Sequence, residues 1–362
     1  MKAALASFVG VLVLLASCAG IDGGSSSDVR RGTLILIGGG LDDDAAYVWR
    51  RFVELASAHG TPRIVIATAA TGPQDEEAVD KAESLSVWSP GIAVDILRRE
   101  TPTAASVAMI DGATAMFFTG GDQKRITDRY RPEGRATPEW DAMRRLLDRG
   151  GVIAGASAGD AMMGPRMILG GASASALGIP PKDPGDGPVA LGPRTGLGMD
   201  FLPHALTDSH WFERDRMGRL VAALVADGLR VGIGVGEDAA VEVDLSSGVV
   251  TGLTTSETLL VDATHVVREG RSLKGAVGRL VARGDRVKLD AWRPGPPAAT
   301  SVDARPVPVV EPGQNRQLAS WRLFRHASPP GLAVRRLELE GHAVVVRPAA
   351  NGDVAFDIIV PN

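Results

Sequence analysis

A serine on a predicted sharp turn is the first candidate for chemistry in this sequence. Residues 155–159 have the pattern Gly-x-Ser-x-Gly, with Ser157 at the centre, and they directly follow an apolar run at 151–154. In a nucleophile elbow, a buried strand leads into a strained turn that presents the serine hydroxyl, and small residues flank the serine because the backbone is tight. The pattern therefore predicts that Ser157 is a nucleophile. A closely packed strand–helix turn without catalytic function is the alternative.

A serine hydroxyl needs a general base, and the base needs a group that orients it. Among the six histidines, His210 stands out because it lies between an expected strand at 205–208 and an expected helix at 214–227. Glu237 ends the apolar run 231–236, and a carboxylate in such a buried place is unfavourable unless it is paired. We therefore predict that His210 is the base and Glu237 its orienting carboxylate, with Asp238 as the competing candidate.

Three arginines follow His210 at the expected start of a helix. Arg216 and Arg219 are three residues apart and share a helix face, and Arg214 precedes them. Positive side chains are unfavourable at a helix N-terminus, because the backbone N–H groups there already carry positive partial charge. The spacing therefore indicates that an anionic group lies close to these guanidinium groups.

The elements that must position these residues alternate between strand and helix. Strands are expected at 33–37, 63–68, 93–97, 115–118, 151–154, 205–208 and 231–235, and helices at about 43–59, 138–149 and 214–227. This alternation predicts an α/β fold, a three-layer sandwich around a mostly parallel sheet. Beyond a proline-rich linker, alternating runs at 334–339, 343–346 and 354–360 predict a small C-terminal β-rich extension.

The composition excludes several classes of function. The chain has 362 residues, with 39 Lys and Arg against 43 Asp and Glu, a net charge of −4 and a mean hydropathy of +0.06. It is therefore long enough for a sizeable core and has no broad basic field for nucleic acid. A single cysteine excludes a disulfide framework and a four-cysteine zinc site. The glycines at 38–40 lack the spacing of a dinucleotide loop, so we expect no cofactor and no metal.

The first residues of the chain have the pattern of an export signal. Lys2 precedes an apolar run at 8–15, which is too short to cross a hydrocarbon core of about 30 Å as a helix, and small residues follow it. Cys18 comes next, in an arrangement that resembles the lipobox of bacterial lipoproteins, whose cysteine becomes lipidated. The sequence therefore predicts a signal peptide at 1–17, a lipid anchor on Cys18 and a tether at 18–31. The protein would then be exported, and held at the bacterial cell envelope or extracellular.

Four blocks of the sequence resemble the signature blocks of cyanophycinases, in the dipeptidase E-like serine peptidase family. They lie at 117–123, 155–159, 208–219 and 232–240, in the order typical of that family. The resemblance covers a predicted catalytic domain at 32–292 and leaves out the linker and extension at 293–362. It implies a fold similar to that of class I glutamine amidotransferases. It also implies that Ser157 is the nucleophile, His210 the general base and Glu237 the orienting acid.

The same resemblance implies the groups that surround these three residues. The backbone N–H groups of Gly121 and Ala158 are expected to form the oxyanion hole. Polar side chains are expected to line the substrate cleft: Gln123, Asp208, Arg214, Arg216 and Arg219. Two features depart from the family pattern. Ser209 stands where the family has a glutamine, and the shorter serine side chain cannot reach as far. Residues 170–196 form a Gly- and Pro-rich insert.

These observations predict a secreted serine exopeptidase that hydrolyses aspartyl peptides, with β-aspartyl peptides such as cyanophycin as the leading substrate. The alternatives are an isoaspartyl or α-aspartyl dipeptidase, a non-catalytic surface lipoprotein that binds acidic peptides, and an amidotransferase-like enzyme, whose chemistry normally uses a cysteine where Ser157 stands. The expected partners are an aspartyl peptide and, for a homodimer, a second copy of the chain. Contact with a membrane is expected only through the lipid anchor.

Overall fold

The computed structural model describes residues 31–41, 45–58, 60–180, 190–256, 258–294, 307–308, 335–339 and 341–361. The predicted signal peptide, Cys18 and almost all of the predicted tether lie outside these residues, as do most of the proline-rich linker and the middle of the 170–196 insert. Within the described ranges, the helices are all too short or too polar to cross a membrane.

The first large sheet contains the predicted parallel strands. Its order is β15-β11-β10-β1-β5-β4-β2-β3, and the five strands from β1 to β3 in this order run parallel. The antiparallel strands β10, β11 and β15 extend it beyond β1. The bounds are β1 Thr33–Ile37, β2 Arg63–Ala67, β3 Ala93–Leu97, β4 Ala115–Phe118, β5 Val152–Ala156, β10 Ala240–Asp244, β11 Val249–Gly252 and β15 Arg286–Lys288.

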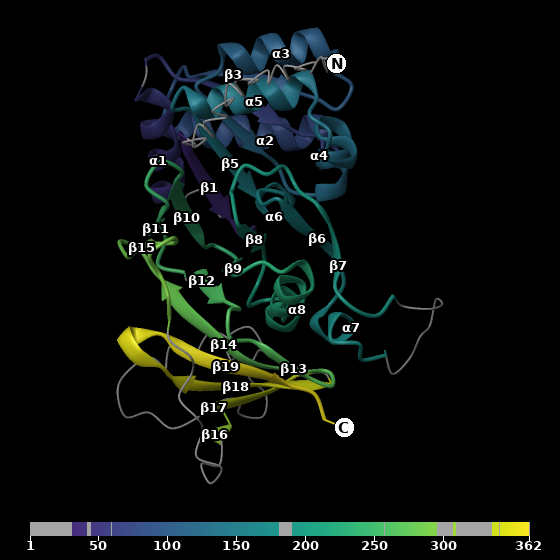
Figure 1. The fold of residues 1–362 in the computed structure, drawn as a ribbon. Coiled ribbons are helices and arrows are strands. Elements are labelled where there is room, and N and C mark those ends of the chain that lie inside the picture. The colour runs from purple at the N-terminus through teal and green to yellow at the C-terminus, as the bar shows by residue number, and fades with distance from the viewer. Residues whose placement is uncertain are drawn as a thin grey trace, which may run out of the picture.

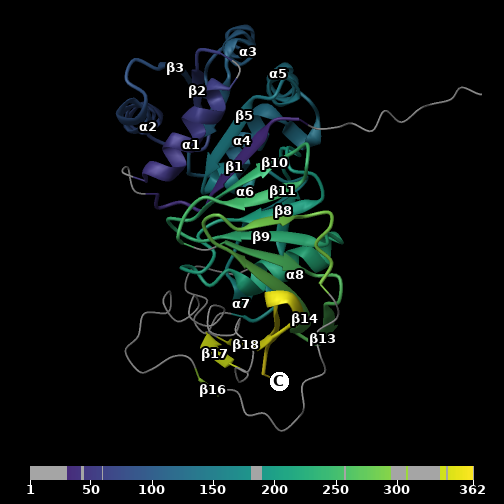
Figure 2. The same ribbon diagram turned by 90° about the vertical axis from the view of Figure 1, so that its left-hand side faces the viewer.

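Helices cover both faces of the parallel strands, with α1 (Ala46–Ser57) and α2 (Gln74–Trp88) on one face and α3 (Thr103–Gly112) and α5 (Pro138–Asp148) on the other (Figure 2). Successive strand residues point to opposite faces. In β1, Leu34 and Leu36 therefore pack in the cluster of α3 and α5, whereas Ile35 and Ile37 pack in the cluster of α1. The predicted three-layer α/β fold is confirmed. The remaining helices are α4 Gln123–Tyr130, α6 Ala158–Ala161, α7 Ser173–Ala176 and α8 Met217–Asp227, with 3-10 turns at Pro132–Gly134 and Ala350–Gly352.

A second large sheet contains the predicted C-terminal strands. Its order is β16-β17-β18-β19-β14-β12-β9-β8, with β13 paired to β14. The bounds are β8 Ala205–Asp208, β9 Val231–Val235, β12 Thr258–Asp262, β13 Val267–Glu269, β14 Ser272–Val281, β16 Val307–Pro308, β17 Arg335–Leu339, β18 His342–Pro348 and β19 Val354–Ile359. Because β19 pairs with β14, strands on either side of the boundary predicted at residue 293 share one sheet (Figure 1). The C-terminal strands thus extend the sheet that holds β8 and β9, and they do not stand apart from it. A small sheet pairs β6 (Arg166–Gly170) with β7 (Arg194–Leu197).

The candidate residues lie just beyond the C-terminal ends of strands, where sites form in α/β sheets. Ser157 follows β5, His210 follows β8 and Glu237 follows β9. Helix α8 begins at Met217, three residues later than the sequence predicts. The reason is Asp215, whose φ of 47° lies in the left-handed region and cannot continue a right-handed helix.

Candidate active site

Ser157 lies on a strained turn between β5 and α6. Its φ of 54° and ψ of −106° fall outside the regions that residues with a side chain ordinarily adopt. The glycines of the motif are needed because of close backbone contacts: a Cβ on Gly159 would lie 2.5 Å from the carbonyl oxygen of Phe118, and one on Gly155 would overlap the backbone of Gly159. The Gly-x-Ser-x-Gly pattern thus corresponds here to a sharp turn that presents a partly exposed serine.

The structure brings Ser157, His210 and Glu237 together in a chain of two hydrogen bonds. Ser157 Oγ lies 2.8 Å from His210 Nε2, and His210 Nδ1 lies 2.7 Å from Glu237 Oε1. Since a carboxylate only accepts, the tautomer with its proton on Nδ1 satisfies both contacts, and Nε2 accepts from the serine hydroxyl. Asp238, the competing candidate, instead donates its backbone N–H to the carbonyl of Gly39.

The environment of His210 favours the neutral imidazole. Burial lowers the pKa of His210 below its usual 6.5, and the positive charges of Arg214 and Arg216 lower it further, while the hydrogen bond to Glu237 opposes them. A neutral imidazole can accept a proton from a hydroxyl, which is what general-base catalysis requires. The arrangement can therefore activate Ser157 near neutral pH.

Glu213 supports this arrangement and was missed in the sequence. Its Oε2 accepts a hydrogen bond of 2.9 Å from the backbone N–H of Glu237 and so fixes the start of the segment that carries the orienting carboxylate. Burial, with the nearby negative charges of Glu237 and Asp238, raises the pKa of Glu213. Nothing in the spacing of Glu213 distinguishes it from an ordinary helix-start acid, so no sequence signal could have identified it.

The glycines at 38–40 pack directly against the imidazole and the carboxylate. A Cβ on Gly39 would lie 2.6 Å from His210 Nε2, and one on Gly40 would lie 3.4 Å from the Cβ of Glu237. The carbonyl of Gly38 accepts the backbone N–H of His210. This glycine run, which lacks the spacing of a dinucleotide loop, therefore has a clear structural role beside the candidate site.

The two predicted oxyanion donors belong to segments that adjoin the serine: the Gly120–Gly121 loop and the start of α6. Gly121 has a φ of 132°, and a Cβ there would clash with the backbone of Ala70, so only glycine fits. A Cβ on the adjacent Gly120 would lie 3.9 Å from Ser157 Oγ, which shows how closely this loop approaches the hydroxyl. Ala158 directly follows the serine. Within the described part of the chain, neither the Gly121 nor the Ala158 N–H has a hydrogen-bond acceptor.

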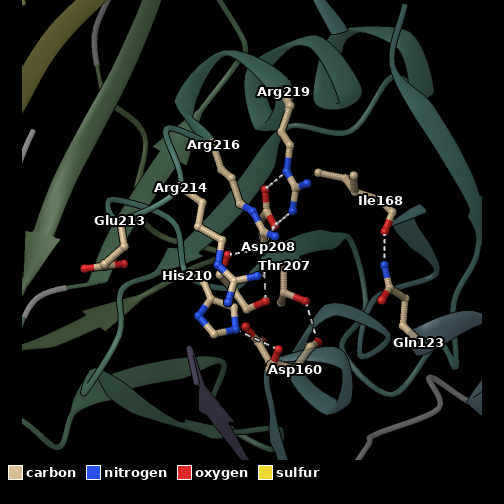
Figure 3. A network of polar contacts seen from close by, with 12 residues as sticks. Gln123, Asp160, Ile168, Thr207, Asp208, His210, Glu213, Arg214, Arg216 and Arg219 are labelled. Atoms are coloured by element: carbon tan, nitrogen blue, oxygen red, sulfur yellow. Dashed lines mark hydrogen bonds and ion pairs between the residues drawn. The ribbon is translucent and has the colours of Figure 1, made fainter. Parts of the chain in front are cut away.

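The anionic group expected near the arginines is Asp208. Arg219 binds it bidentately, with Nε 2.8 Å from Oδ2 and Nη2 2.5 Å from Oδ1, and Nη1 of Arg216 lies 3.6 Å from Oδ1 (Figure 3). Asp208 is fully buried and Arg219 is 6% exposed, and Arg219 also donates to the carbonyl of Gly171. The expectation that Asp208 and Arg219 line the substrate cleft stays a prediction, since both side chains are almost fully covered here. They form a buried ion pair that holds the start of α8.

The other two arginines differ in exposure. The side chain of Arg214 is 54% exposed, and its Nε lies 3.9 Å from Glu237 Oε1, so its guanidinium stands beside the chain of hydrogen bonds and is accessible to a ligand. Arg216 is mostly covered and donates to the carbonyl of Ser209 at 2.6 Å. Burial lowers its pKa to about 10, which still leaves it protonated at neutral pH. Arg214 is thus the guanidinium most available to a ligand.

Gln123 and Ser209 occupy positions that limit what they can contact. Gln123 is the first residue of α4, and its Nε2 donates to the carbonyl of Ile168 at 2.6 Å, as Figure 3 shows. This bond holds β6 against α4 and leaves the amide oxygen as the group that could meet a ligand. Ser209 is 3% exposed, so its short side chain lies under the surface.

Asp160 is a buried acid close to this network that the sequence did not single out. It lies three residues after Ser157, and among the described residues neither carboxyl oxygen has a hydrogen-bond partner. Burial, together with the negative charge of Asp208, raises its pKa well above 3.8. The uncharged carboxylic acid is therefore favoured, which suits a position next to an ion pair that already contains one carboxylate.

Other features of the described residues lie apart from Ser157. A cavity of about 920 Å³ lies near the N-terminal ends of β8 and β9 and is lined by residues such as His204, Arg230 and Asp290. Residues of the hydrogen-bonded chain are absent from its lining. In the same described ranges, no group of three or more His, Cys, Asp or Glu side chains is placed to hold a metal ion.

Comparison with known proteins places the sequence among peptidases. The family described as Peptidase family S51 matches residues 34–248. The cyanophycinases of Trichormus variabilis and of Nostoc sp. are each 31% identical over 280 residues, which cover 71% of this chain and 86% of the relative. A solved structure of a peptidase from an acI-B1 Actinobacterium has a similar fold, with a TM-score of 0.51 and 16% identity, covering 72% of this chain and 97% of that one.

The family match covers the part of the chain that holds the candidate site. The matched residues 34–248 include the serine turn, the histidine turn and the segment of Glu237, and they make up more than half of the chain. The cyanophycinase alignments extend over a longer part of the chain. The protein therefore belongs to peptidase family S51 and is a serine-type peptidase.

Proposed function

We propose that the protein hydrolyses aspartyl peptides with Ser157 as nucleophile, His210 as general base and Glu237 as the group that orients the imidazole. The observation that carries this proposal is the unbroken chain of hydrogen bonds, 2.8 Å from Ser157 Oγ to His210 Nε2 and 2.7 Å from His210 Nδ1 to Glu237 Oε1. A serine, an imidazole and a carboxylate in series are what acyl transfer by a weak nucleophile requires.

The reaction would proceed in two halves. As Ser157 Oγ attacks the carbonyl carbon of the scissile amide, His210 Nε2 takes the hydroxyl proton and then gives it to the departing amine, which leaves an acyl-enzyme. Water attacks the ester in the second half, with the same imidazole as base, and releases the acid product. The N–H groups of Gly121 and Ala158 would stabilise the oxyanion in both halves. Removing one such donor typically costs about 2.7–4 kcal/mol of transition-state stabilisation.

The substrate class follows from the charges beside the serine. Arg214 has an exposed guanidinium next to Glu237, and a guanidinium binds a carboxylate through two parallel hydrogen bonds. A substrate with a free carboxylate close to the scissile amide suits this site, as an aspartyl peptide has. The name of the relatives supports β-aspartyl peptides such as cyanophycin as the first substrate to test. The Ser209 position, where the sequence departs from the family, makes α-aspartyl dipeptides the second.

The test compares the parent protein with Ser157→Ala and with Ser86→Ala, a matched change at an exposed serine of α2. Each protein is incubated with cyanophycin, a β-aspartyl-arginine dipeptide and an α-aspartyl dipeptide, and the products are identified by mass. Ser157→Ala is expected to keep its far-UV circular dichroism and to lose about 10⁶-fold in kcat, the scale seen when a triad nucleophile is removed. Ser86→Ala is expected to match the parent. Release of terminal units alone supports an exopeptidase.

The competing function is binding of acidic peptides without catalysis. A fluorophosphonate probe separates the two, because it forms a covalent adduct only with an activated serine. Labelling of the parent at Ser157, and its loss in Ser157→Ala, supports catalysis. Hydrolysis that persists in Ser157→Ala, or an unlabelled parent that binds aspartyl peptides without cleaving them, contradicts it.

We also propose that the protein is exported and anchored by lipid at Cys18. The support is the sequence pattern of residues 1–18: one positive charge, a short apolar run, and small residues before a single cysteine. Expressed in a bacterial host, the full chain is expected in the membrane fraction and to incorporate labelled fatty acid. Cys18→Ser is expected to abolish the labelling, and labelling that persists in this variant contradicts the assignment.

A further inference from the structure

The turn that carries the two less buried arginines is strained and needs support. Asp215 lies between Arg214 and Arg216 and has a φ of 47°. Aspartate tolerates this left-handed conformation better than most residues, but it still prefers the right-handed region. A turn of this kind persists only where its surroundings hold it.

Two segments from other parts of the chain hold this turn. Ser173 Oγ, in α7, donates a hydrogen bond of 2.5 Å to the backbone carbonyl of Asp215. At the side chain of Asp215, His342 Nε2 lies 3.5 Å from Oδ1. His342 is the first residue of β18 and lies outside the residues that match the peptidase family.

The position of His342 is itself well defined. The residue is 2% exposed, and it pairs with Leu339 across the tight turn that joins β17 to β18. At this turn, a Cβ on Gly341 would lie 3.1 Å from the side chain of Ile179, which belongs to the 170–196 insert. The hairpin therefore contacts both the insert and the arginine-bearing turn.

Apolar packing joins the same three segments. One cluster of buried side chains includes Trp211 and Phe212 from the turn, Leu177 from the insert, and Val344 and Phe356 from the C-terminal strands. In Figure 1, β18 and β19 lie on the side of the molecule where α7 and α8 are found. The C-terminal strands thus form part of the support beneath the residues that follow His210.

We propose that His342 is a positioning residue for substrate binding, acting through Asp215. By contacting the Asp215 carboxylate it keeps Asp215 in its left-handed conformation, and this sets the directions of Arg214 and Arg216 on either side. The inference rests on the proposed function, in which Arg214 binds the substrate carboxylate. The contact of His342 is with Asp215, so its loss is expected to affect binding much more than the chemical step at a pH where His210 is already neutral.

The test measures binding and turnover separately. In a Ser157→Ala background, calorimetry gives the Kd of a β-aspartyl-arginine dipeptide without hydrolysis. His342→Ala is expected to weaken binding by about 5- to 10-fold, in the range of coupling between residues in contact. In the active protein it is expected to raise KM by a similar factor while kcat changes less than about twofold. His342→Gln, whose amide N–H could reach the Asp215 carboxylate, is expected to restore part of the loss.

A control and a second variant separate positioning from general damage. Arg347 lies in β18, five residues after His342, and forms an ion pair with Asp357 of β19; Arg347→Gln breaks this pair and is expected to lower stability without changing Kd. Asp215→Asn, which keeps tolerance of the left-handed conformation, is expected to weaken binding. Because His342 acts through Asp215, the double variant is expected to be no worse than the more affected single variant. Hydrogen exchange at residues 211–217 is expected to speed up in His342→Ala.

Several outcomes overturn the inference. These are an unchanged Kd and unchanged exchange in His342→Ala, additive effects in the double variant, or an equal loss of binding in Arg347→Gln. Failure of the proposed function has a different signature, since the parent then neither hydrolyses the dipeptides nor reacts with a fluorophosphonate. Hydrogen exchange at 211–217 decides the positioning role even in that case, because it needs no substrate.

Discussion

At the scale of single residues, the protonation state of His210 is the property on which the proposed chemistry depends most. Burial, Arg214 and Arg216 all lower its pKa, while the hydrogen bond to Glu237 and the negative charge of that carboxylate work in the opposite direction. The imidazole must be neutral to accept the serine proton, so a lowered pKa extends the pH range in which the base is functional.

The first prediction follows from the direction in which the pKa of His210 is shifted. We expect kcat/KM for a β-aspartyl dipeptide to persist as pH falls below 6.5, the usual histidine pKa, and to decline only once pH drops below the lowered pKa of His210. Arg214→Gln removes a positive charge, so it is expected to raise that pKa and move the acid limb to higher pH. Arg145→Gln, a change at an exposed arginine bound to Asp111, serves as the control and should leave the limb in place. An acid limb that stays fixed in Arg214→Gln contradicts the electrostatic argument.

The second prediction concerns a residue without a side chain. Gly39→Ala places a methyl group against His210 Nε2 at a φ of 101°, and the ring must move to make room. Displacement of a catalytic group by about 1 Å typically costs about 100-fold in rate, so kcat/KM is expected to fall at least that far. Gly60→Ala is the control, because its φ of 129° is strained in a comparable way but nothing lies within 4 Å. Equal activity of the two variants, measured by steady-state kinetics, would show that the imidazole tolerates the methyl.

These residues differ in how far the sequence could reveal them. Ser157 was predicted from a motif with a physical rationale, and His210 and Glu237 from their places at element ends. Gly39 could not be distinguished, because the need for glycine comes from a ring 171 positions later in the chain. The expectation of an anionic group near the arginines was correct. Its identity as Asp208 depended on the angle between β8 and α8, which spacing alone does not give.

At the scale of elements, β9 and the turn after His210 are shaped to fit each other. A Cβ on Gly234, in the middle of β9, would lie 2.6 Å from Cε2 of Trp211. The indole therefore lies flat on the part of the strand that has no side chain, and Trp211 is completely buried. This contact fixes the residue next to His210 against the strand that leads to Glu237.

The third prediction tests this packing. Gly234→Ala is expected to lower the free energy of unfolding by about 1–3 kcal/mol, because an extra methyl in a packed core forces neighbours off their preferred conformations. Urea denaturation followed by fluorescence gives this value. Gly112→Ala, at the exposed end of α3 with nothing within 4 Å, is expected to be neutral or to stabilise by up to about 1 kcal/mol. A Gly234→Ala protein as stable as the parent would mean that Trp211 can shift freely.

The elements that the sequence predicted best are the buried strands. β1, β4, β8 and β9, which are almost entirely buried, have the predicted bounds, and so does the more exposed edge strand β3. Helices α2, α3 and α4 were not predicted, and α2 shows why. It buries only Ala78, Ser84 and Leu85, too few apolar residues to form a recognisable stripe. The start of α8 was predicted three residues too early, because an aspartate in the left-handed conformation does not change the hydrophobic pattern.

At the scale of the whole molecule, the C-terminal strands complete a sheet that begins near the candidate site. β19 pairs with β14 and β18 pairs with β19, so the sheet runs from the strand before His210 to the last described strand. The alternating runs predicted these strands, but not their partners. The pairing of Val277 with Ala355 joins residues far apart in the chain, and no local pattern specifies such a register.

The fourth prediction measures how much the packing of the C-terminal strands contributes to the free energy of unfolding. Phe356 is fully buried in the cluster that contains Trp211, so Phe356→Ala is expected to lower the free energy of unfolding by about 3–5 kcal/mol. Val267→Ala, at a side chain that is 58% exposed in β13 of the same sheet, is expected to change it by less than about 0.5 kcal/mol. Thermal and urea melts of both variants check the contrast. Similar melts for the two would show that the C-terminal strands fold independently of the rest.

The sharing of one sheet by early and late strands also has a consequence for biosynthesis. Helix α8 ends at Asp227, yet part of the apolar cluster that covers it comes from residues between 337 and 360. While a ribosome is still making the intervening stretch, the face of α8 turned toward those strands has nothing of its own chain to meet. The final packing of α8 therefore forms only once residues 337–360 have been synthesised.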